Sequence, residues 1–203
     1  CCMCLEHDEQ IQSDPGESNW IVVKNIHKYL RRTKDKFLVY GGSEELVVSG
    51  YTDASFQTDK NDFLSQLGFV FCLNGGVVSW KSSKQSTVAD SITEVAASKA
   101  VKEAVWIRKF ITELSVVPNI PGLIDLYCDN NGAIAQTKER RSQQKSKHIQ
   151  RRYHLIREII DRGDVKISRV STNANVTDPF TKPLPQPKHE SHTAVIGIRF
   201  IKM

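Results

Sequence analysis

Gly50-Tyr51-Thr52-Asp53-Ala54-Ser55 is the central motif of the chain, around which the other predicted elements are organised. The residues before and within it, 46–52, are mostly β-branched, apolar or aromatic and predict a strand. Asp53 comes late in that strand and is followed by two small side chains, so a metal ion could approach its carboxylate. A lone aspartate at a strand end usually caps or turns the chain. A catalytic interpretation therefore needs support from other acidic residues.

A tight hairpin follows this strand. Residues 68–73 and 76–81 are largely apolar, and Asn74-Gly75 separates them. An Asn-Gly pair between apolar runs is a strong hairpin signal, because both residues tolerate the positive φ of a type I′ turn. Residues 46–82 are therefore predicted to form three successive antiparallel strands.

A long helix is predicted from about Ala89 to Leu114 by side chains that recur every three or four residues. The stripe is small in its first half, where a backbone can approach closely, and bulky in its second. Its members are Ala97, Ala100, Ala104, Ile107, Ile111 and Leu114. Glu94 lies in the first turns, where a glutamate most often complements the helix dipole. Its position alone does not distinguish this role from metal binding.

Two more aspartates stand in settings that resemble that of Asp53. Asp129 ends the predicted strand 123–128 and has a helix behind it. Asp178 precedes Pro179, after a predicted strand from Asp164 to Val170 and a polar loop. Strand ends are where α/β sheets place their sites, so Asp53 and Asp129 are expected to lie in one site. Asp178 is a third candidate, which its strand-free setting alone does not place there.

The densest positive charge lies between Lys138 and Arg152, with seven Lys or Arg and one acid. An apolar stripe from Ile149 to Ile160 would hold these residues on a rigid helix. Two interpretations stay open, a solvated face or contact with nucleic-acid phosphates. The candidate contacts are Lys145, Lys147, His148, Arg151 and Arg152.

A second basic, amphipathic helix is predicted from Asn19, with an apolar stripe from Val22 to Leu30, followed by a short strand at 37–40. An ordinary surface helix is the preferred interpretation here, with nucleic-acid contact as the alternative. Residues 1–18 are polar and aperiodic, and the segment beyond Pro185 is expected to be weakly ordered.

Composition excludes several classes of protein. At 203 residues the chain suits one domain with an appendage. It has no apolar run of the ~18 residues that a membrane span needs, and no signal-peptide pattern. Five cysteines, three of them in the first four residues, give no disulfide framework and favour a reducing, intracellular compartment. Because the chain starts with Cys1 rather than methionine, we expect it to be a fragment.

Taken together, the motifs resemble the ribonuclease H region that closes the Pol polyprotein of copia-type LTR retrotransposons, the TNT-like plant group in particular. The resemblance covers about residues 15–200. It rests on Gly-Tyr-Thr-Asp-Ala-Ser (50–55), Val-Ser-Trp-Lys-Ser-Ser-Lys-Gln (78–85), Ala-Val-Trp-Ile-Arg-Lys (104–109), Tyr-Cys-Asp-Asn-Asn-Gly-Ala (127–133), Lys-His-Ile (147–149), Arg-Tyr-His-Leu-Ile-Arg-Glu (152–158) and Thr-Asp-Pro-Phe-Thr-Lys-Pro-Leu (177–184). Residues 19–42 resemble the last piece of a reverse transcriptase.

The resemblance implies an RNase H-like α/β fold, a mixed sheet with an antiparallel three-strand meander plus parallel strands, flanked by helices. The implied domains are a poorly ordered remnant (1–18), a C-terminal piece of reverse transcriptase (19–43), the RNase H-like domain (44–184) and a tail (185–203). The implied location is cytoplasmic, in a virus-like particle, or nuclear.

The implied activity is an endonuclease that cleaves the RNA strand of RNA–DNA hybrids during reverse transcription. Two Mg²⁺ or Mn²⁺ ions would act, with Asp53 bridging them, Glu94 and Asp129 on one, and Asp178 on the other. The implied partners are the hybrid and the reverse transcriptase portion of the same polyprotein.

The sequence departs from the family pattern around Thr93-Glu94-Val95, which is three residues shorter than usual. Losing three residues turns the rest of a helix by roughly 60°, so Glu94 is expected to be imperfectly placed. The loop that carries a proton-shuttling histidine in cellular ribonucleases H reads Ser171-Thr172-Asn173, and His148 is the nearest candidate. The alternative function is therefore a catalytically inactive nucleic-acid-binding or structural remnant. An integrase-like core would need a DNA-end-binding appendage, for which no candidate is found.

Overall fold

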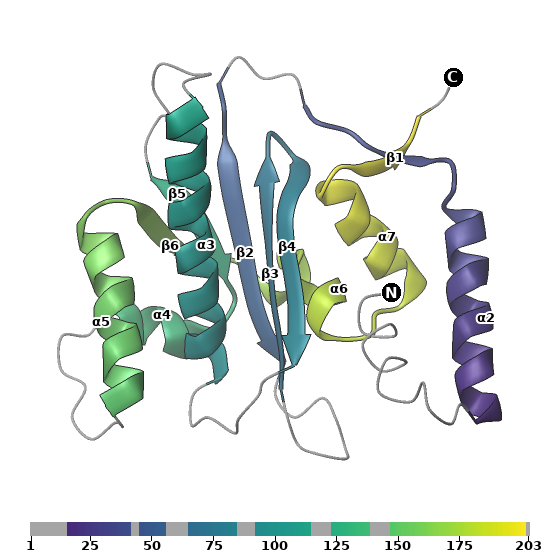
Figure 1. Ribbon diagram of the computed structural model, residues 1–203, viewed down its shortest axis with the longest axis horizontal. Helices are drawn as coiled ribbons and strands as arrows, with labels where there is room; N and C mark the ends of the chain where they lie inside the picture. The colour runs from purple at the N-terminus through teal and green to yellow at the C-terminus, as the bar shows by residue number, and fades with distance from the viewer. Residues whose placement is uncertain are drawn as a thin grey trace.

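A five-stranded mixed sheet forms the centre of the computed structural model (Figure 1). Residues 16–41, 45–55, 65–84, 92–114, 123–138 and 147–201 are described. The strands are β2 (Val48–Ser55), β3 (Gln66–Leu73), β4 (Gly76–Lys84), β5 (Ile124–Cys128) and β6 (Val165–Arg169), in the spatial order β4-β3-β2-β5-β6. β2–β3 and β3–β4 pair antiparallel, whereas β2–β5 and β5–β6 pair parallel. The predicted meander plus parallel strands is confirmed.

The hairpin between β3 and β4 has the predicted turn. Asn74 has φ 48° and Gly75 has φ 79°, as a type I′ turn requires at both central positions. The hairpin pairs Leu73 with Gly76 and so fixes the register of β3 against β4. In the separate register of β3 against β2, Gly68 lies opposite Asp53.

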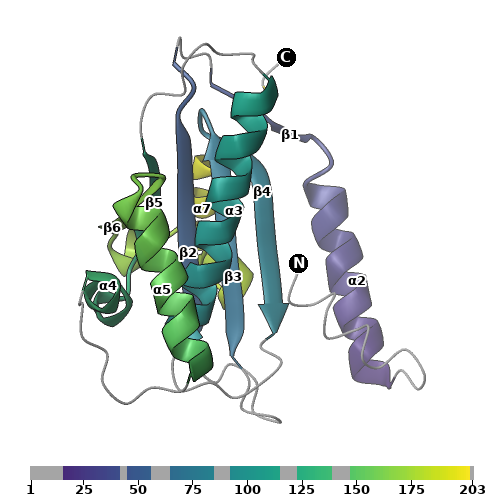
Figure 2. The ribbon, with the colours of Figure 1, turned by 60° about the vertical axis from the view of Figure 1, so that its left-hand side comes forward.

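Helices cover both faces of the sheet (Figures 1 and 2). On one face lie α3 (Ile92–Leu114), α4 (Asn131–Lys138) and α5 (Lys147–Asp161), and on the other lie α6 (Asp178–Thr181) and α7 (Gln186–Val195). The short helix η1 (Thr172–Ala174) comes between β6 and α6 in the chain. Side chains alternate between two cores along β3. Phe69 and Phe71 pack in the core under α3 and α5, and Val70 and Cys72 pack in the core on the opposite face.

The small-residue stripe of α3 packs as predicted in its first half, where Ala97, Ala100 and Ala104 are buried. The prediction for Leu114 is wrong, because this side chain is 52% exposed. A 23-residue helix is about 35 Å long and outruns the strands beneath it. Among the described side chains of α5, Ile156 and Ile159 are buried, and Ile160, which was predicted for the stripe, is only partly buried.

The prediction of a weakly ordered segment beyond Pro185 is also wrong. This segment forms α7 and then β7 (Ile198–Phe200), which pairs antiparallel with β1 (Lys36–Leu38). The predicted N-terminal helix is present as α2 (Glu17–Arg32), and its Tyr29 meets His189 of α7 edge-on, with ring centroids 5.8 Å apart. The N-terminal segment α2–β1 thus contacts the C-terminal segment α7–β7 through a strand pair and an aromatic contact.

Several predictions fall on residues outside the described ranges. These include the structure of residues 1–15 and the start of the long helix at Ala89, which is described from Ile92. No helix in the described part of the chain is long and apolar enough to cross a membrane.

Gly197 offers a test of the contact between β7 and the hairpin. Gly197 has φ 89°, and a Cβ there would lie 2.6 Å from the Val39 carbonyl oxygen and 2.9 Å from that of Gly75. Gly75 also has a positive φ, 79°, but a Cβ on it would meet nothing within 4 Å. We expect Gly197→Ala to lower the melting temperature by about 4 °C more than Gly75→Ala, since only the former adds a clash to the backbone strain. Equal losses would contradict tight docking of β7.

Candidate active site

Asp53 lies near the end of β2, the strand that pairs with both β3 and β5, and it is only 6% exposed. Its antiparallel neighbour, Gly68, has no side chain, which leaves room for another element above it. A Cβ on Gly68 would come within 2.8 Å of Thr181 Cγ2 and 2.9 Å of Thr177 Cγ2. The lack of a side chain at Gly68 therefore lets α6 lie directly on the sheet beside Asp53.

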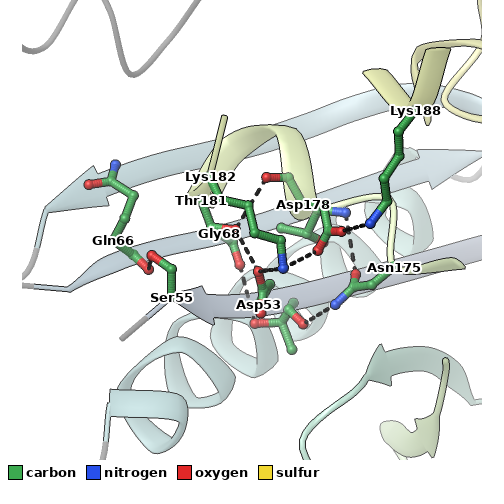
Figure 3. Close-up of polar contacts among 11 residues, drawn as sticks. Asp53, Ser55, Gln66, Gly68, Asn175, Asp178, Thr181, Lys182 and Lys188 are labelled. Carbon is green, nitrogen blue, oxygen red and sulfur yellow. Dashed lines mark hydrogen bonds and ion pairs between the residues drawn. The ribbon is translucent and has the colours of Figure 1, made fainter. Parts of the chain in front are cut away.

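The single turn of α6 and the residue that follows it carry three polar side chains toward Asp53. Asp178, Thr181 and Lys182 are spaced i, i+3 and i+4, so they share one side of the turn. Asp178 and Thr181 are fully buried. Thr181 Oγ1 donates a hydrogen bond of 2.5 Å to Asp53 Oδ2 (Figure 3).

Two lysines neutralise the buried carboxylates. Lys182 Nζ lies 2.8 Å from Asp178 Oδ1 and 3.7 Å from Asp53 Oδ2, and in Figure 3 it points between the two acids. The contact with Asp178 Oδ1 is an ion pair outside hydrogen-bond geometry. Lys188 Nζ of α7 donates to Asp178 Oδ2 at 2.7 Å. Asp53 and Asp178 therefore share one ammonium group, as the predicted convergence of these two aspartates requires.

The pKa values reflect this crowding. Burial raises the pKa of Asp53 above its ordinary value of 3.8; the Thr181 hydrogen bond and the Lys182 charge oppose the shift, and the charges of Asp129 and Asp178 add to it. Burial lowers the pKa of Lys182, but the close contact with Asp178 and the charges of Asp53 and Asp129 outweigh it and leave that pKa raised. The site therefore favours a bound cation and penalises an uncompensated Asp53 anion.

The position of α6 is fixed from two sides. Asn175 Nδ2 donates to the Thr52 carbonyl oxygen at 3.1 Å, next to Asp53. Ser82 Oγ of β4 donates to the Phe180 carbonyl oxygen at 2.7 Å. Asn175 is fully buried, although the sequence places it in what was predicted to be a plain polar loop.

The other two predicted acids are less closely tied. Asp129 follows β5 directly and is partly buried; its charge acts on both Asp53 and Lys182. Glu94 belongs to the first turn of α3, but its side chain is not among those described. Within the described residues, no group of three or more His, Cys, Asp or Glu side chains is arranged to hold a metal ion. The four-carboxylate site stays a prediction.

The predicted nucleic-acid contacts also stay a prediction. Lys145 lies outside the described ranges. The other four belong to α5, but their side chains are not described: Lys147, His148, Arg151 and Arg152.

Sequence reasoning missed Thr181, Lys182, Lys188 and Asn175 as parts of the site. The i, i+3, i+4 spacing after Asp178 could have indicated Thr181 and Lys182. Lys188 and His192 could not have been found this way, because α7 itself was not predicted. His192 is 4% exposed, its Nε2 has no hydrogen-bond partner among the described residues, and burial lowers its pKa while the Asp178 charge opposes that shift.

The residues fit a divalent cation of the hard, oxygen-binding kind. Asp53 and Asp178 are carboxylates, the ligands that Mg²⁺ takes in proteins. They are buried, and the structure holds a cationic group between them, which shows that the position attracts positive charge. Asp178 Oδ1 accepts no hydrogen bond in the described structure and retains capacity for a ligand contact.

Comparison with known proteins finds relatives among the retrovirus-related Pol polyproteins of plant transposons. The chain is 37% identical over 188 residues to the retrovirus-related Pol polyprotein from transposon TNT 1-94 of Nicotiana tabacum, covering 91% of this chain and 14% of the relative. It is 30% identical over 187 residues to that from transposon RE2 of Arabidopsis thaliana, covering 91% and 13%. The chain therefore spans only a small part of these relatives. No protein-family model matches the chain.

Among solved structures, the chain is similar to RNase H1 from the halophilic archaeon Halobacterium salinarum NRC-1. The superposition has a TM-score of 0.47 and 17% sequence identity, and it covers 66% of this chain and 93% of that one.

The raised pKa of Asp53 predicts how a neutral replacement behaves. In EDTA at pH 7 we expect Asp53→Asn to raise the melting temperature by about 2–4 °C, since it removes a charge whose ionisation burial opposes. A raised folded-state pKa means that ionisation destabilises the fold, and this penalty disappears as pH falls below the ordinary value of 3.8. The gain should therefore vanish in thermal melts near pH 3. A loss of stability at pH 7 would contradict the pKa direction.

Proposed function

We propose that this chain, which belongs to the Pol polyproteins of copia-type plant retrotransposons, is their ribonuclease H region and acts as an endonuclease that cleaves the RNA strand of RNA–DNA hybrids during reverse transcription. One observation carries the proposal: the carboxylates of Asp53 in β2 and Asp178 in α6 both lie near the ammonium group of Lys182. In the proposed domain plan, residues 44–184 are the nuclease and residues 19–43 are the end of the reverse transcriptase.

The resemblance implies two Mg²⁺ or Mn²⁺ ions. The residues that would hold them are Asp53, Glu94, Asp129 and Asp178. When bound, these cations supply an activated water and stabilise the leaving 3′-oxygen of the phosphodiester. The chain's own contribution is to position the carboxylates. The Thr181 hydrogen bond fixes Asp53 Oδ2, and the attachment of α6 to Thr52 and Ser82 keeps Asp178 next to it.

The periodicity of α3 supports a role for Glu94. Positions on a helix that are three, four and seven residues apart share one face. The residues at those spacings after Glu94 are Ala97, Ser98 and Val101, and all three are buried, at 4%, 5% and 0% exposure. Position 94 thus shares a helix face with three buried positions. This favours Glu94 as a ligand over the expectation, drawn from the shortened segment, that it is rotated off the site.

The basic face of α5 is proposed to contact the substrate backbone. The helix is anchored to the core by Ile156 and Ile159, which are 1% and 2% exposed, so charges on its other faces would be held rigidly. RNA–DNA hybrids are recognised mainly through backbone and 2′-hydroxyl contacts, for which Lys147, Arg151 and Arg152 are suited.

Cleavage of a hybrid with a labelled RNA strand tests the proposed function. We expect the 203-residue chain to cleave the RNA strand in Mg²⁺ or Mn²⁺ and not in EDTA. Asp129→Asn and Glu94→Gln should each lower the rate at least about 100-fold. The control is Asp125→Asn, which removes an acid within β5, four residues before Asp129 and outside the proposed site. It should leave the rate within about twofold. A folded chain with no cleavage in either metal would instead support the inactive remnant.

Salt dependence tests the substrate contact. Replacing Arg151 and Arg152 by alanine removes two charges proposed to touch phosphates. We expect the slope of log affinity against log salt for a hybrid to fall by about one to two units. The matched change is Arg31→Ala with Arg32→Ala at the end of α2. A lower slope with that pair, and an unchanged slope with the α5 pair, would place the duplex on α2 instead.

A further inference from the structure

Asp178 is a fully buried carboxylate with a cation on each oxygen. Its Oδ1 lies 2.8 Å from Lys182 Nζ and its Oδ2 lies 2.7 Å from Lys188 Nζ, while the residue itself is 0% exposed. Burying a carboxylate is strongly unfavourable unless it is paired. The two ammonium groups thus supply the compensation that keeps Asp178 inside the protein.

The first of these lysines also serves Asp53. Lys182 Nζ lies 3.7 Å from Asp53 Oδ2 and points between the two acids (Figure 3). A cation that binds both carboxylates needs the same oxygens. Two positive charges a few ångströms apart repel each other strongly in a poorly solvated site, so the ammonium group and a divalent cation compete for this position.

We propose that Lys182 and Lys188 are internal counter-ions that hold the site together without metal, and that a divalent cation must displace them from Asp178 and Asp53. The inference rests on the proposed function, because it takes the carboxylates to be a divalent-cation site. Both lysine side chains can move aside, since they are 33% and 30% exposed and have long, flexible stems. Lys182 and Lys188 are positioning residues, because they act through the carboxylates.

The second counter-ion depends on a distant part of the chain. Lys188 belongs to α7, which leads into β7, and β7 pairs with β1. The next residue, His189, makes the edge-on contact with Tyr29 of α2. The N-terminal α2–β1 segment therefore helps to hold Lys188 at Asp178.

Lysine variants test the proposal in two separate measurements. Lys182→Met and Lys188→Met keep an unbranched side chain without the charge. Thermal melts in EDTA should show a loss of about 5 °C or more for each, because Asp178 loses a partner. Calorimetric titration with Mn²⁺ should show binding about tenfold tighter than in the unmodified chain, because a competing charge is gone. The control is Lys109→Met, whose lysine pairs with Glu113 at 3.6 Å on the exposed surface of α3 and should change neither value.

Failure in either measurement overturns the proposal: no loss of stability in EDTA, or Mn²⁺ binding no tighter than in the unmodified chain. If Lys188→Met does not fold, the same change combined with Asp178→Asn decides, because a neutral partner no longer needs the ammonium. We expect that double variant to fold with the melting temperature of Asp178→Asn alone, and a further loss would refute the counter-ion role. Failure of the proposed function looks different, since the unmodified chain would then bind no Mn²⁺ and cleave no hybrid.

Discussion

The hydrogen bond from Thr181 to Asp53 is the contact on which the candidate site depends. It joins the central strand β2 to the short helix α6, two elements far apart in the sequence. It forms only because Gly68 leaves the sheet surface open and because Asn175 and Ser82 fasten both sides of α6. Without the docking of α6 on the sheet, no contact would hold Asp178 and Lys182 beside Asp53.

Bringing two buried carboxylates together is unfavourable, and the structure offsets this with cations and hydrogen bonds rather than with distance. The pKa of Asp53 is raised in spite of Thr181 and Lys182. The site therefore keeps an electrostatic strain, because the ionised form of Asp53 is disfavoured in the folded protein. Strain of this kind is typical of functional sites, where a ligand completes the compensation. A protein selected only for stability would more readily carry apolar or neutral side chains at these positions.

Local patterns in the sequence were sufficient for most of the sheet and the long helices. The Asn74-Gly75 turn, the apolar run of β3 and the small stripe of α3 each depend on neighbours a few residues away, and each is present. Leu114 was assigned to the buried stripe because periodicity does not reveal where the sheet beneath a helix ends. β7 was missed because three residues make a strand only by pairing with β1.

The sequence by itself indicated the family, the mixed sheet and Asp53 and Asp178 as candidate site residues, because these features are encoded in motifs and in short-range periodicity. Only the tertiary structure decided that Lys182 lies between those aspartates and that Lys188 reaches Asp178 from α7. The physical reason is that charge compensation is set by distances in space. A lysine's partner depends on which elements pack together, and packing is decided by the whole chain.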